Sequence, residues 1–375
     1  MIVTALFLAA TVWTIGGIVA LGIVTRRRAA GTFSIASPER AVSILKPLCG
    51  LDASLESNLR SFFEQSYGAY ELVFGTENPN DPALAVVHAL RAEYPHVRCR
   101  VIRHSGGTAS NPKVRNLLAM LEAGSHDLFV ISDSNVRVPT DYLHDLVRTR
   151  ENCGAGIVTN VIVGVGESSL GGAIESAHLN GFCASGASLP TLLGEASVIG
   201  KSMLMSRSEL ESLGGLHKVS DVLAEDFVLG KMYQHGGLRV VLARTVIESA
   251  TGDTTVMDCF RRQRRWATLR WRVKPATFVL ELLTSPVVLS ALAWLGGAPL
   301  HLFVPWAFAL SLLRDASGWA TLRGARRLWI PVLVGPGREA VALAAWLVAP
   351  WRRAVAWRGN RMTLGAGTIL FRRTA

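Results

Sequence analysis

The sequence predicts an α/β protein with a mostly parallel sheet and a membrane-associated segment at each end. Three observations support this prediction. Apolar strand-like runs alternate with helix-like segments in the middle of the chain, residues 1–24 carry no charged side chain, and residues 276–350 are again strongly apolar. Alternating strands and helices are typical of a parallel sheet covered by helices on both faces. An apolar stretch of about 20 residues is long enough to cross a bilayer.

The first segment, residues 1–25, is expected to be an uncleaved transmembrane anchor. A signal peptide is the alternative, but it would have a basic leader and a small-residue cleavage site. Here the basic residues Arg26, Arg27 and Arg28 follow the apolar run. Because arginines concentrate on the cytoplasmic side of membrane segments, the domain that follows is expected in the cytoplasm.

Residues 38–270 have an ordinary globular composition and are long enough to bury a core of their own. The pattern predicts these elements in order: strand 41–45, helix 55–63, strand 71–75, helix 82–93, strand 97–103, helix 112–122, strand 128–132, helix 139–150 and a β-branched run at 157–163. In sheets of this kind, ligands bind beyond the carboxyl ends of the strands. Polar residues near these ends are therefore the first candidates for a site.

Residues 271–350 are expected to form membrane helices. Two passes are predicted at 276–295 and 299–313. The stretch 328–350 carries Arg338 and Glu339 near its centre, where charges in a bilayer are costly. We therefore expect it to be a re-entrant or interfacial segment, broken at Gly335–Gly337 and lying against the preceding domain. Residues 351–375 form a basic tail, expected on the cytoplasmic side.

The chain carries a net charge of +11, with arginine clusters beside its apolar segments. Basic clusters in this position mark cytoplasmic loops and attract anionic lipid headgroups. Nucleic-acid binding is the alternative interpretation of a basic chain. The apolar segments favour a membrane partner, and no nucleic-acid partner is expected.

Two aspartates follow predicted strands. Asp81 lies in the loop after the second strand, and its alternative interpretation is a turn that caps the following helix. Asp133 directly follows the buried strand 128–132. A carboxylate at such a strand end can bind a divalent cation that bridges diphosphate oxygens, although a capping role is equally compatible with its position.

Two further groups lie closer to the second apolar region. Asp226 begins a helical stretch, where a carboxylate could deprotonate an acceptor hydroxyl or simply favour the helix dipole. Arg262, Arg265 and Trp266 suit a diphosphate ligand, because guanidinium groups pair with phosphate oxygens in a fork. The alternative for this second group is a juxtamembrane helix that binds lipid headgroups.

The order of these residues is more specific than any one of them. Asp81, Asp133, Asp226 and Arg262-x-x-Arg265-Trp266 resemble the D, D, D, (Q/R)xxRW series of family 2-like glycosyltransferases. More specifically, the chain resembles ceramide glucosyltransferases over nearly its whole length. Stretches that carry this resemblance include Ile44-Leu45-Lys46-Pro47-Leu48, Asn111-Pro112-Lys113, Asp133-Ser134, Gly200 with Met203-Leu204-Met205, Gly214-Gly215-Leu216 and Ala224-Glu225-Asp226.

The resemblance implies a GT-A-type, Rossmann-like catalytic domain and an inverting transfer of glucose from UDP-glucose to ceramide. In this interpretation Asp81 contacts the uridine part of the donor, and Lys46 lines the donor pocket. Asp133 organises a divalent cation (Mg²⁺ or Mn²⁺) and the diphosphate.

The resemblance also implies that Asp226 is the general base, and that Arg262, Arg265 and Trp266 hold the diphosphate. The second motif departs from Asp-x-Asp, because Asn135 replaces its second carboxylate. The expected metal site therefore has one firm carboxylate, Asp133.

Three alternatives remain. A related bacterial group glycosylates hopanoids with an N-acetylhexosamine, and the sequence does not fix the sugar. A non-catalytic lipid-binding scaffold is the second alternative, although all the acidic positions and the Arg-Trp pair are present. A processive polysaccharide synthase is the third, and the small number of membrane segments argues against it. The expected location is a membrane, the bacterial inner membrane, with the catalytic domain in the cytoplasm.

Overall fold

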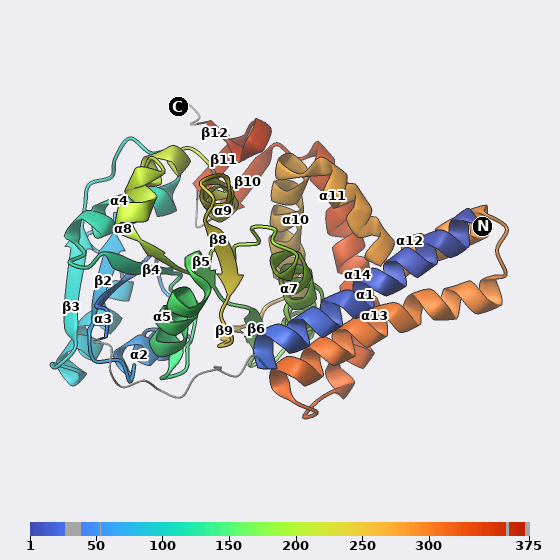
Figure 1. Ribbon diagram of the computed structural model, residues 1–375, viewed down its shortest axis with the longest axis horizontal. Coiled ribbons are helices and arrows are strands. Elements are labelled where there is room, and N and C mark those ends of the chain that lie inside the picture. The colour runs from blue at the N-terminus through green and yellow to red at the C-terminus, as the bar shows by residue number, and fades with distance from the viewer. Residues whose placement is uncertain (27–38, 53, 358–359, 372–375) are drawn as a thin grey trace.

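The computed structural model describes residues 1–26, 39–52, 54–357 and 360–371 of the 375-residue chain. Of the arginines expected to mark the cytoplasmic side, Arg27, Arg28, Arg358, Arg372 and Arg373 lie outside the described residues. Figure 1 shows a sheet-containing domain, built mainly from the first two thirds of the chain, beside a group of long helices formed by the N-terminus and the C-terminal third.

The central sheet has seven strands in the order β3-β2-β1-β4-β7-β5-β8. Its strands are β1 (Val42–Pro47), β2 (Tyr70–Thr76), β3 (Arg98–Arg103), β4 (Leu128–Ser132), β5 (Ala155–Thr159), β7 (Ser202–Ser206) and β8 (Arg239–Leu242). Strand β7 runs antiparallel to both of its neighbours, and the other pairings are parallel. The expected mostly parallel sheet is confirmed, and the carboxyl ends of β1, β2 and β4 lie along one edge.

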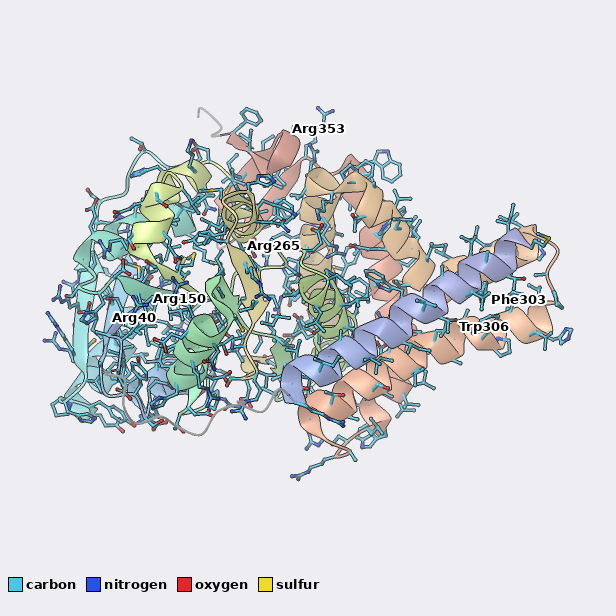
Figure 2. The ribbon with its side chains drawn as sticks, viewed as in Figure 1. Arg40, Arg150, Arg265, Phe303, Trp306 and Arg353 are labelled. Carbon is cyan, nitrogen blue, oxygen red and sulfur yellow. The ribbon has the colours of Figure 1, made fainter. Side chains whose placement is uncertain are left out.

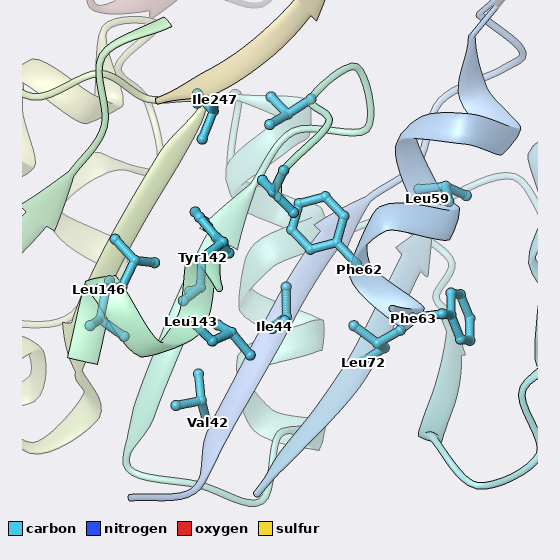
Figure 3. Close-up of a cluster of buried hydrophobic side chains, with 14 of the residues drawn as sticks. Val42, Ile44, Leu59, Phe62, Phe63, Leu72, Tyr142, Leu143, Leu146 and Ile247 are labelled. Carbon is cyan, nitrogen blue, oxygen red and sulfur yellow. The ribbon is translucent and has the colours of Figure 1, made fainter. Parts of the chain in front are cut away.

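Helices cover both faces of this sheet, as the alternating pattern predicted. They are α2 (Leu55–Phe63), α3 (Ala83–Glu93) and α5 (Tyr142–Cys153) against one core, and α4 (Pro112–Ala123) and α9 (Glu225–His235) against the other. Neighbouring residues of β1 separate the two cores: Ile44 packs with Phe62 and Leu143, while Leu45 packs into the opposite cluster. Figure 3 shows the first of these clusters. Side chains of successive strand residues point to opposite faces, so an almost continuously apolar strand supplies both cores.

The β-branched run at 157–163 is two strands in the structure. It divides at Asn160 into β5 and β6 (Ile162–Val165), and β6 pairs with β9 (Ile247–Ala250) in a separate two-stranded sheet. The buried Asn160 side chain donates to Thr245 O at 2.7 Å and accepts from Ser202 Oγ at 2.6 Å. These side-chain bonds accompany the change from one sheet to the other.

The two longest helices of the apolar bundle are α1 (Ile2–Arg26) and α13 (Leu300–Arg323), which pack together with α12 (Pro286–Leu295). Phe7 of α1 meets Phe303 of α13 edge-on at 4.8 Å, and Trp306 Nε1 donates to Thr11 Oγ1 at 3.0 Å. Figure 2 labels Phe303 and Trp306 in the part of the bundle farthest from the sheet. Close-packed aromatic rings and a satisfied indole suit helices that meet in an apolar solvent.

The predicted passes differ from the structure in two ways. Residues 276–295 do not form one straight helix: α11 (Pro275–Leu280) and a 3₁₀ turn (Glu281–Thr284) are bent by 82° from α12. Ser285 precedes Pro286 and is extended, as proline imposes on the residue before it. The second pass does not end at residue 313 but continues as α13 to Arg323.

The expected break at Gly335–Gly337 is wrong. Helix α14 (Trp329–Val348) runs through these residues without interruption, and Gly337 instead lies close to Ile174 of α6 (Leu170–Ala177). Among the described residues, two helical segments are long and apolar enough to cross a membrane, Ile2–Arg26 and Trp329–Trp351, with the bent pair as a third if it counts as one span. The expected packing of this region against the sheet-containing domain is confirmed, because α14 contacts α6 and α10 (Val256–Val273).

The charges in α13 and α14 form a buried cluster. Arg338 Nε lies 2.7 Å from Asp315 Oδ2, and Arg314 bridges Asp315 at 2.9 Å and Glu339 at 3.1 Å. Ser311 Oγ also donates to Glu339 at 2.6 Å. Mutual pairing offsets the cost of placing charges in a low-dielectric environment, so neither helix needs a break to expose them.

The basic tail folds onto the domain that contains the large sheet. It forms the antiparallel strands β10 (Ala354–Trp357), β11 (Asn360–Leu364) and β12 (Leu370–Phe371). Leu370 N donates to Asp221 O at 2.7 Å, and Leu223 N donates to Thr368 O at 3.0 Å. The tail therefore lies beside the segment that leads into α9.

Candidate active site

The candidate site forms at the carboxyl edge of the sheet, where the sequence placed it. Asp81 follows β2, and Asp133 follows β4. Asp226 is the second residue of α9, which is far from both in the sequence. The site therefore depends on the contacts that join these segments.

Asp81 ties two loops together. Its carboxylate accepts hydrogen bonds from Gly50 N at 3.0 and 3.1 Å, from Ala83 N at 2.9 Å and from Thr76 Oγ1 at 3.3 Å. The bond to Ala83 caps the start of α3, as the alternative interpretation proposed. The bonds to Gly50 also hold the loop after β1. Asp81 therefore joins the loops that follow β1 and β2, and its contact with uridine stays a prediction.

Lys46 is fully buried beneath the end of β4. Its ammonium group donates to Asp133 O at 2.6 Å and to Ser132 Oγ at 3.2 Å, and it lies 3.6 Å from the ring centre of Phe62. Burial lowers the pKa of Lys46 well below its usual value, although the nearby Asp133 acts in the opposite direction. In the structure Lys46 holds the backbone carbonyl of Asp133 by a hydrogen bond. Its expected direct contact with the donor stays a prediction.

Lys113 joins the two acidic segments. Its ammonium group lies 2.9 Å from Asp133 Oδ1, 2.9 Å from Glu225 Oε1 and 2.9 Å from Gly200 O, so its three donors meet three acceptors. Burial acts to raise the pKa of Asp133, but Lys113 and Lys201 outweigh it and hold that pKa below its usual value. Asp133 is therefore ionised, and α4 fixes its position relative to α9.

Asp226 has the opposite electrostatic environment. Burial first, and then the charge of neighbouring Glu225, raise the pKa of Asp226 to about 6, against the effect of Lys113. Its carboxylate accepts from Gly200 N at 3.0 Å and from Phe227 N at 2.8 Å. A carboxylate with a raised pKa, held by two backbone donors, suits a general base near neutral pH.

Gly200 allows this geometry because a side chain there would collide with Asp226. A Cβ atom at Gly200 would lie 2.5 Å from Asp226 Oδ2 and 2.9 Å from its Cβ. The close approach of the β7 entrance to α9 therefore requires glycine. Gly200 was part of the resemblance, but its contact with Asp226 was not predicted.

Arg262, Arg265 and Trp266 lie on α10, between the sheet-containing domain and the membrane helices. Arg262 forms a short ion pair with Glu175, which is 2% exposed, on α6. Burial raises the pKa of Glu175, against the opposing charges of Arg262, Lys201 and Arg265. Trp266 packs against the first core of the sheet. Figure 2 labels Arg265 between α10 and the strands of the sheet.

The residues present fit a divalent cation only if the donor shares it. Asp133 supplies one partly exposed, ionised carboxylate. In the described part of the chain, no group of three or more His, Cys, Asp or Glu residues is arranged to hold a metal ion. Mg²⁺ commonly takes one or two carboxylates and fills its remaining positions with phosphate oxygens and water. A cation bound between Asp133 and a diphosphate agrees with this donor set.

Lys113 and Glu175 are the functional candidates that sequence reasoning missed. Both are buried charges, and both contact residues that the sequence did identify. Lys113 follows Asn111 and Pro112, which form the N-cap and first turn of α4. That motif indicated a helix start, but a lysine at the start of a helix could have pointed into solvent, so its ionic partners required the structure.

The match to known families agrees with this geometry. The sequence pattern of glycosyl transferase family 21 matches residues 6–370. The chain belongs to glycosyl transferase family 21. It is 27% identical to ceramide glucosyltransferase 1 of Caenorhabditis elegans over 341 residues. The aligned residues make up 87% of this chain and 72% of the relative. The ceramide glucosyltransferase of Komagataella phaffii is 37% identical over 111 residues, 28% of this chain and 22% of that protein.

A solved structure supports the fold of this family 21 chain. The mannosyltransferase PcManGT from Pyrobaculum calidifontis, in complex with GDP-Man and Mn²⁺, is similar with a TM-score of 0.51 and 17% identity, covering 93% of this chain and 99% of that one. The expected GT-A fold class is confirmed. The chain is therefore a UDP-sugar glycosyltransferase of the ceramide glucosyltransferase type, with apolar helices suited to a membrane.

Proposed function

We propose that this chain transfers glucose from UDP-glucose to the primary hydroxyl of ceramide, with inversion, at the cytoplasmic face of a membrane. The observation that carries the proposal is that two carboxylates at the sheet edge, Asp133 and Asp226, have opposite electrostatic environments. Lys113 keeps Asp133 ionised beside the expected diphosphate, while burial raises the pKa of Asp226 towards neutrality. Two carboxylates with separated pKa values suit different roles in one site.

In the proposed reaction, Asp226 accepts the proton of the lipid hydroxyl as its oxygen attacks the anomeric carbon. The bond from that carbon to the UDP oxygen breaks, and UDP leaves with the negative charge. In this proposal Arg262 and Arg265 of α10 balance this charge, and the ion pair with Glu175 orients Arg262. A divalent cation held by Asp133 and the diphosphate would supply further charge compensation. One base and one displacement suffice, so the reaction requires no covalent intermediate.

Contacts within the protein support a membrane orientation. Gly296, in the turn between α12 and α13, lies against Val3 of α1, so this turn and the N-terminus are at the same end of the bundle. The tail is hydrogen-bonded to the catalytic domain at Asp221. We therefore place the N-terminus outside, the catalytic domain and tail in the cytoplasm, and α1, α12 and α13 in the membrane, with α14 lying against α6 and α10.

The transfer is tested with purified full-length protein, UDP-[¹³C]glucose and ceramide, with mass spectrometry and NMR of the extracted lipid. The expected product is a β-linked glucosylceramide. Parallel reactions with UDP-N-acetylglucosamine and a hopanoid test the alternative acceptor and sugar. Transfer only to the hopanoid, or an α-linked product, would contradict the proposal.

The orientation is tested by labelling introduced cysteines with a membrane-impermeant reagent on intact cells. The side chains of Leu295 and Ala366 are exposed; Leu295 precedes the turn that lies against α1 near the N-terminus, whereas Ala366 belongs to the tail on the catalytic domain. We therefore expect Leu295→Cys to react from outside and Ala366→Cys to react only after lysis. Labelling of Ala366→Cys on intact cells would contradict the proposed orientation.

A further inference from the structure

A small cavity lies where the catalytic domain meets the membrane helices. Its volume is about 50 Å³. A site for one water needs about 10–15 Å³, so the cavity has room for a few small groups but not for a nucleotide or a sugar. Its walls come from α10, α13, α14, the bend between α11 and α12, and the π-helix His178–Cys183.

Two backbone irregularities meet at this cavity. The 82° bend places Glu281, Thr284 and Ser285 in its wall, and the π-helix supplies His178 and Phe182. Irregular backbone at membrane depth is tolerated where it is buried in protein or lines a polar cavity. Single π-turns within helices occur frequently at functional sites. Both irregular segments therefore line the same cavity.

Polar atoms in its wall lack partners. No described residue forms a hydrogen bond with His178 Nδ1, Gln263 Oε1 or Ser285 Oγ, although these residues are only 4%, 4% and 9% exposed. A buried polar group without a partner is destabilising, so three around one cavity indicate a ligand that completes them. Gln263 Oε1 can only accept a hydrogen bond, whereas Ser285 Oγ can donate or accept. The complementary group must therefore contain a donor.

The charges of the same wall are already paired. Arg270 Nε lies 2.9 Å from Glu281 Oε1, Arg314 pairs with Glu339, and Arg338 pairs with Asp315. A phosphate would have to displace these partners. The cavity is consequently suited to an uncharged group, and not to the anionic headgroup of a phospholipid.

Helix α10 carries both part of the cavity wall and the arginines proposed to bind the diphosphate. Gln263, Ala267 and Arg270 recur at the spacing of one face of α10, and Gln263 directly follows Arg262. On the opposite side of the cavity, Leu343 and Trp346 of α14 form an apolar wall. A polar head with an attached hydrocarbon chain fits this combination.

We propose that this cavity is the acceptor-head subsite, in which His178, Gln263 and Ser285 bind the uncharged amide or hydroxyl groups of the lipid acceptor. The inference rests on the proposed function, because it assumes that the acceptor is a lipid with such a head. The subsite selects acceptors by hydrogen bonding, and the hydrocarbon chains leave along α14.

The test measures transfer to ceramide by full-length Gln263→Leu, Ser285→Ala and Ser285→Thr. Loss of one hydrogen bond is expected to raise the acceptor KM about tenfold in the first two variants, with kcat and the donor KM unchanged. Ser285→Thr retains the hydroxyl and should restore the wild-type KM. The matched control is Ser290→Ala on α12, whose hydroxyl bonds its own helix at Pro286 O and lies outside the cavity.

Acceptor analogues separate recognition from a structural effect. N-methyl ceramide lacks the amide donor, and 3-deoxy ceramide lacks the secondary hydroxyl. For the wild-type enzyme, kcat/KM should be about tenfold lower with at least one analogue than with ceramide. For Gln263→Leu, kcat/KM should be the same with that analogue as with ceramide, because the change in the enzyme and the change in the acceptor remove the same hydrogen bond. If Gln263→Leu does not fold, Ser285→Ala and Ser285→Thr provide the same comparison.

Wild-type acceptor KM values in folded Gln263→Leu and Ser285→Ala, or additive losses with both analogues, would overturn the subsite. This result is distinct from failure of the proposed function, which would appear in the wild-type enzyme as absence of transfer to ceramide.

Discussion

Replacing Asp226 by Asn tests the assignment of the base most directly. The variant keeps the size of the side chain but cannot accept a proton at neutral pH. We expect glycosyl transfer to fall by ~10²–10⁴, the usual contribution of a general base. Binding of UDP should be unchanged, because the variant leaves Asp133, Arg262 and Arg265 in place.

The pH dependence of the wild type supplies the magnitude from the structure. Burial, assisted by the charge of Glu225, raises the pKa of Asp226 to about 6. The base acts only when ionised, so at pH 5 roughly one molecule in ten is active and kcat/KM should be about tenfold lower than at pH 7. The residual activity of Asp226→Asn should lack this acidic limb.

The effect of the variant on stability should be small. Because the pKa of Asp226 is raised in the folded state, its ionisation opposes folding, and this penalty develops as the pH rises from about 4 to about 6. Asn removes the penalty at neutral pH. It also has one oxygen in place of two, so either Gly200 N or Phe227 N loses its acceptor. These opposing effects should leave the Tm nearly unchanged.

The assay combines steady-state transfer from pH 5 to 8, calorimetric titration with UDP, and thermal unfolding. Asp258→Asn is the matched control, because Asp258 is an exposed carboxylate at the start of α10. Near-wild-type turnover of Asp226→Asn would refute the assignment. If Glu225→Gln were then inactive, the base would be Glu225, despite its ion pair with Lys113.

Three further substitutions test other parts of the structure. Asp133→Ala should raise the KM for UDP-glucose, and the loss should depend on Mn²⁺ concentration in titrations; full wild-type activity in excess chelator would contradict the metal role. Gly200→Ala should lower kcat by roughly 10², because the new Cβ displaces Asp226, and unchanged kcat would show that its position is not critical. Arg338→Met should destabilise the protein by about 3–5 kcal/mol, because it leaves buried carboxylates without their partner. Thermal unfolding in detergent checks this loss against Arg326→Met, a change at an exposed side chain, and equal Tm values would contradict it.

The sequence by itself determined the sheet and the position of its catalytic edge. Apolar runs of strand length, separated by helical spacing, leave few arrangements other than a parallel sheet with helices on both faces. An acidic residue after such a run must lie at the carboxyl edge, which is why Asp81 and Asp133 could be located without coordinates. The apolar character of residues 1–24 likewise predicted α1, because an uncharged stretch of that length suits a bilayer.

Only the tertiary structure decided which charged residues are buried and which partners they contact. Lys113 could have faced solvent, and Arg338 with Glu339 predicted a break in a helix that is continuous. The ion pairs of Lys113 with Glu225 and of Arg338 with Asp315 join residues 112 and 23 positions apart in the chain, and local spacing carries no information about such partners. Whether a charge is stabilised or penalised depends on its burial and on what lies opposite it. The raised pKa of Asp226, the ion cluster of α13 and α14, and the cavity beside α10 were therefore decided only when distant segments packed together.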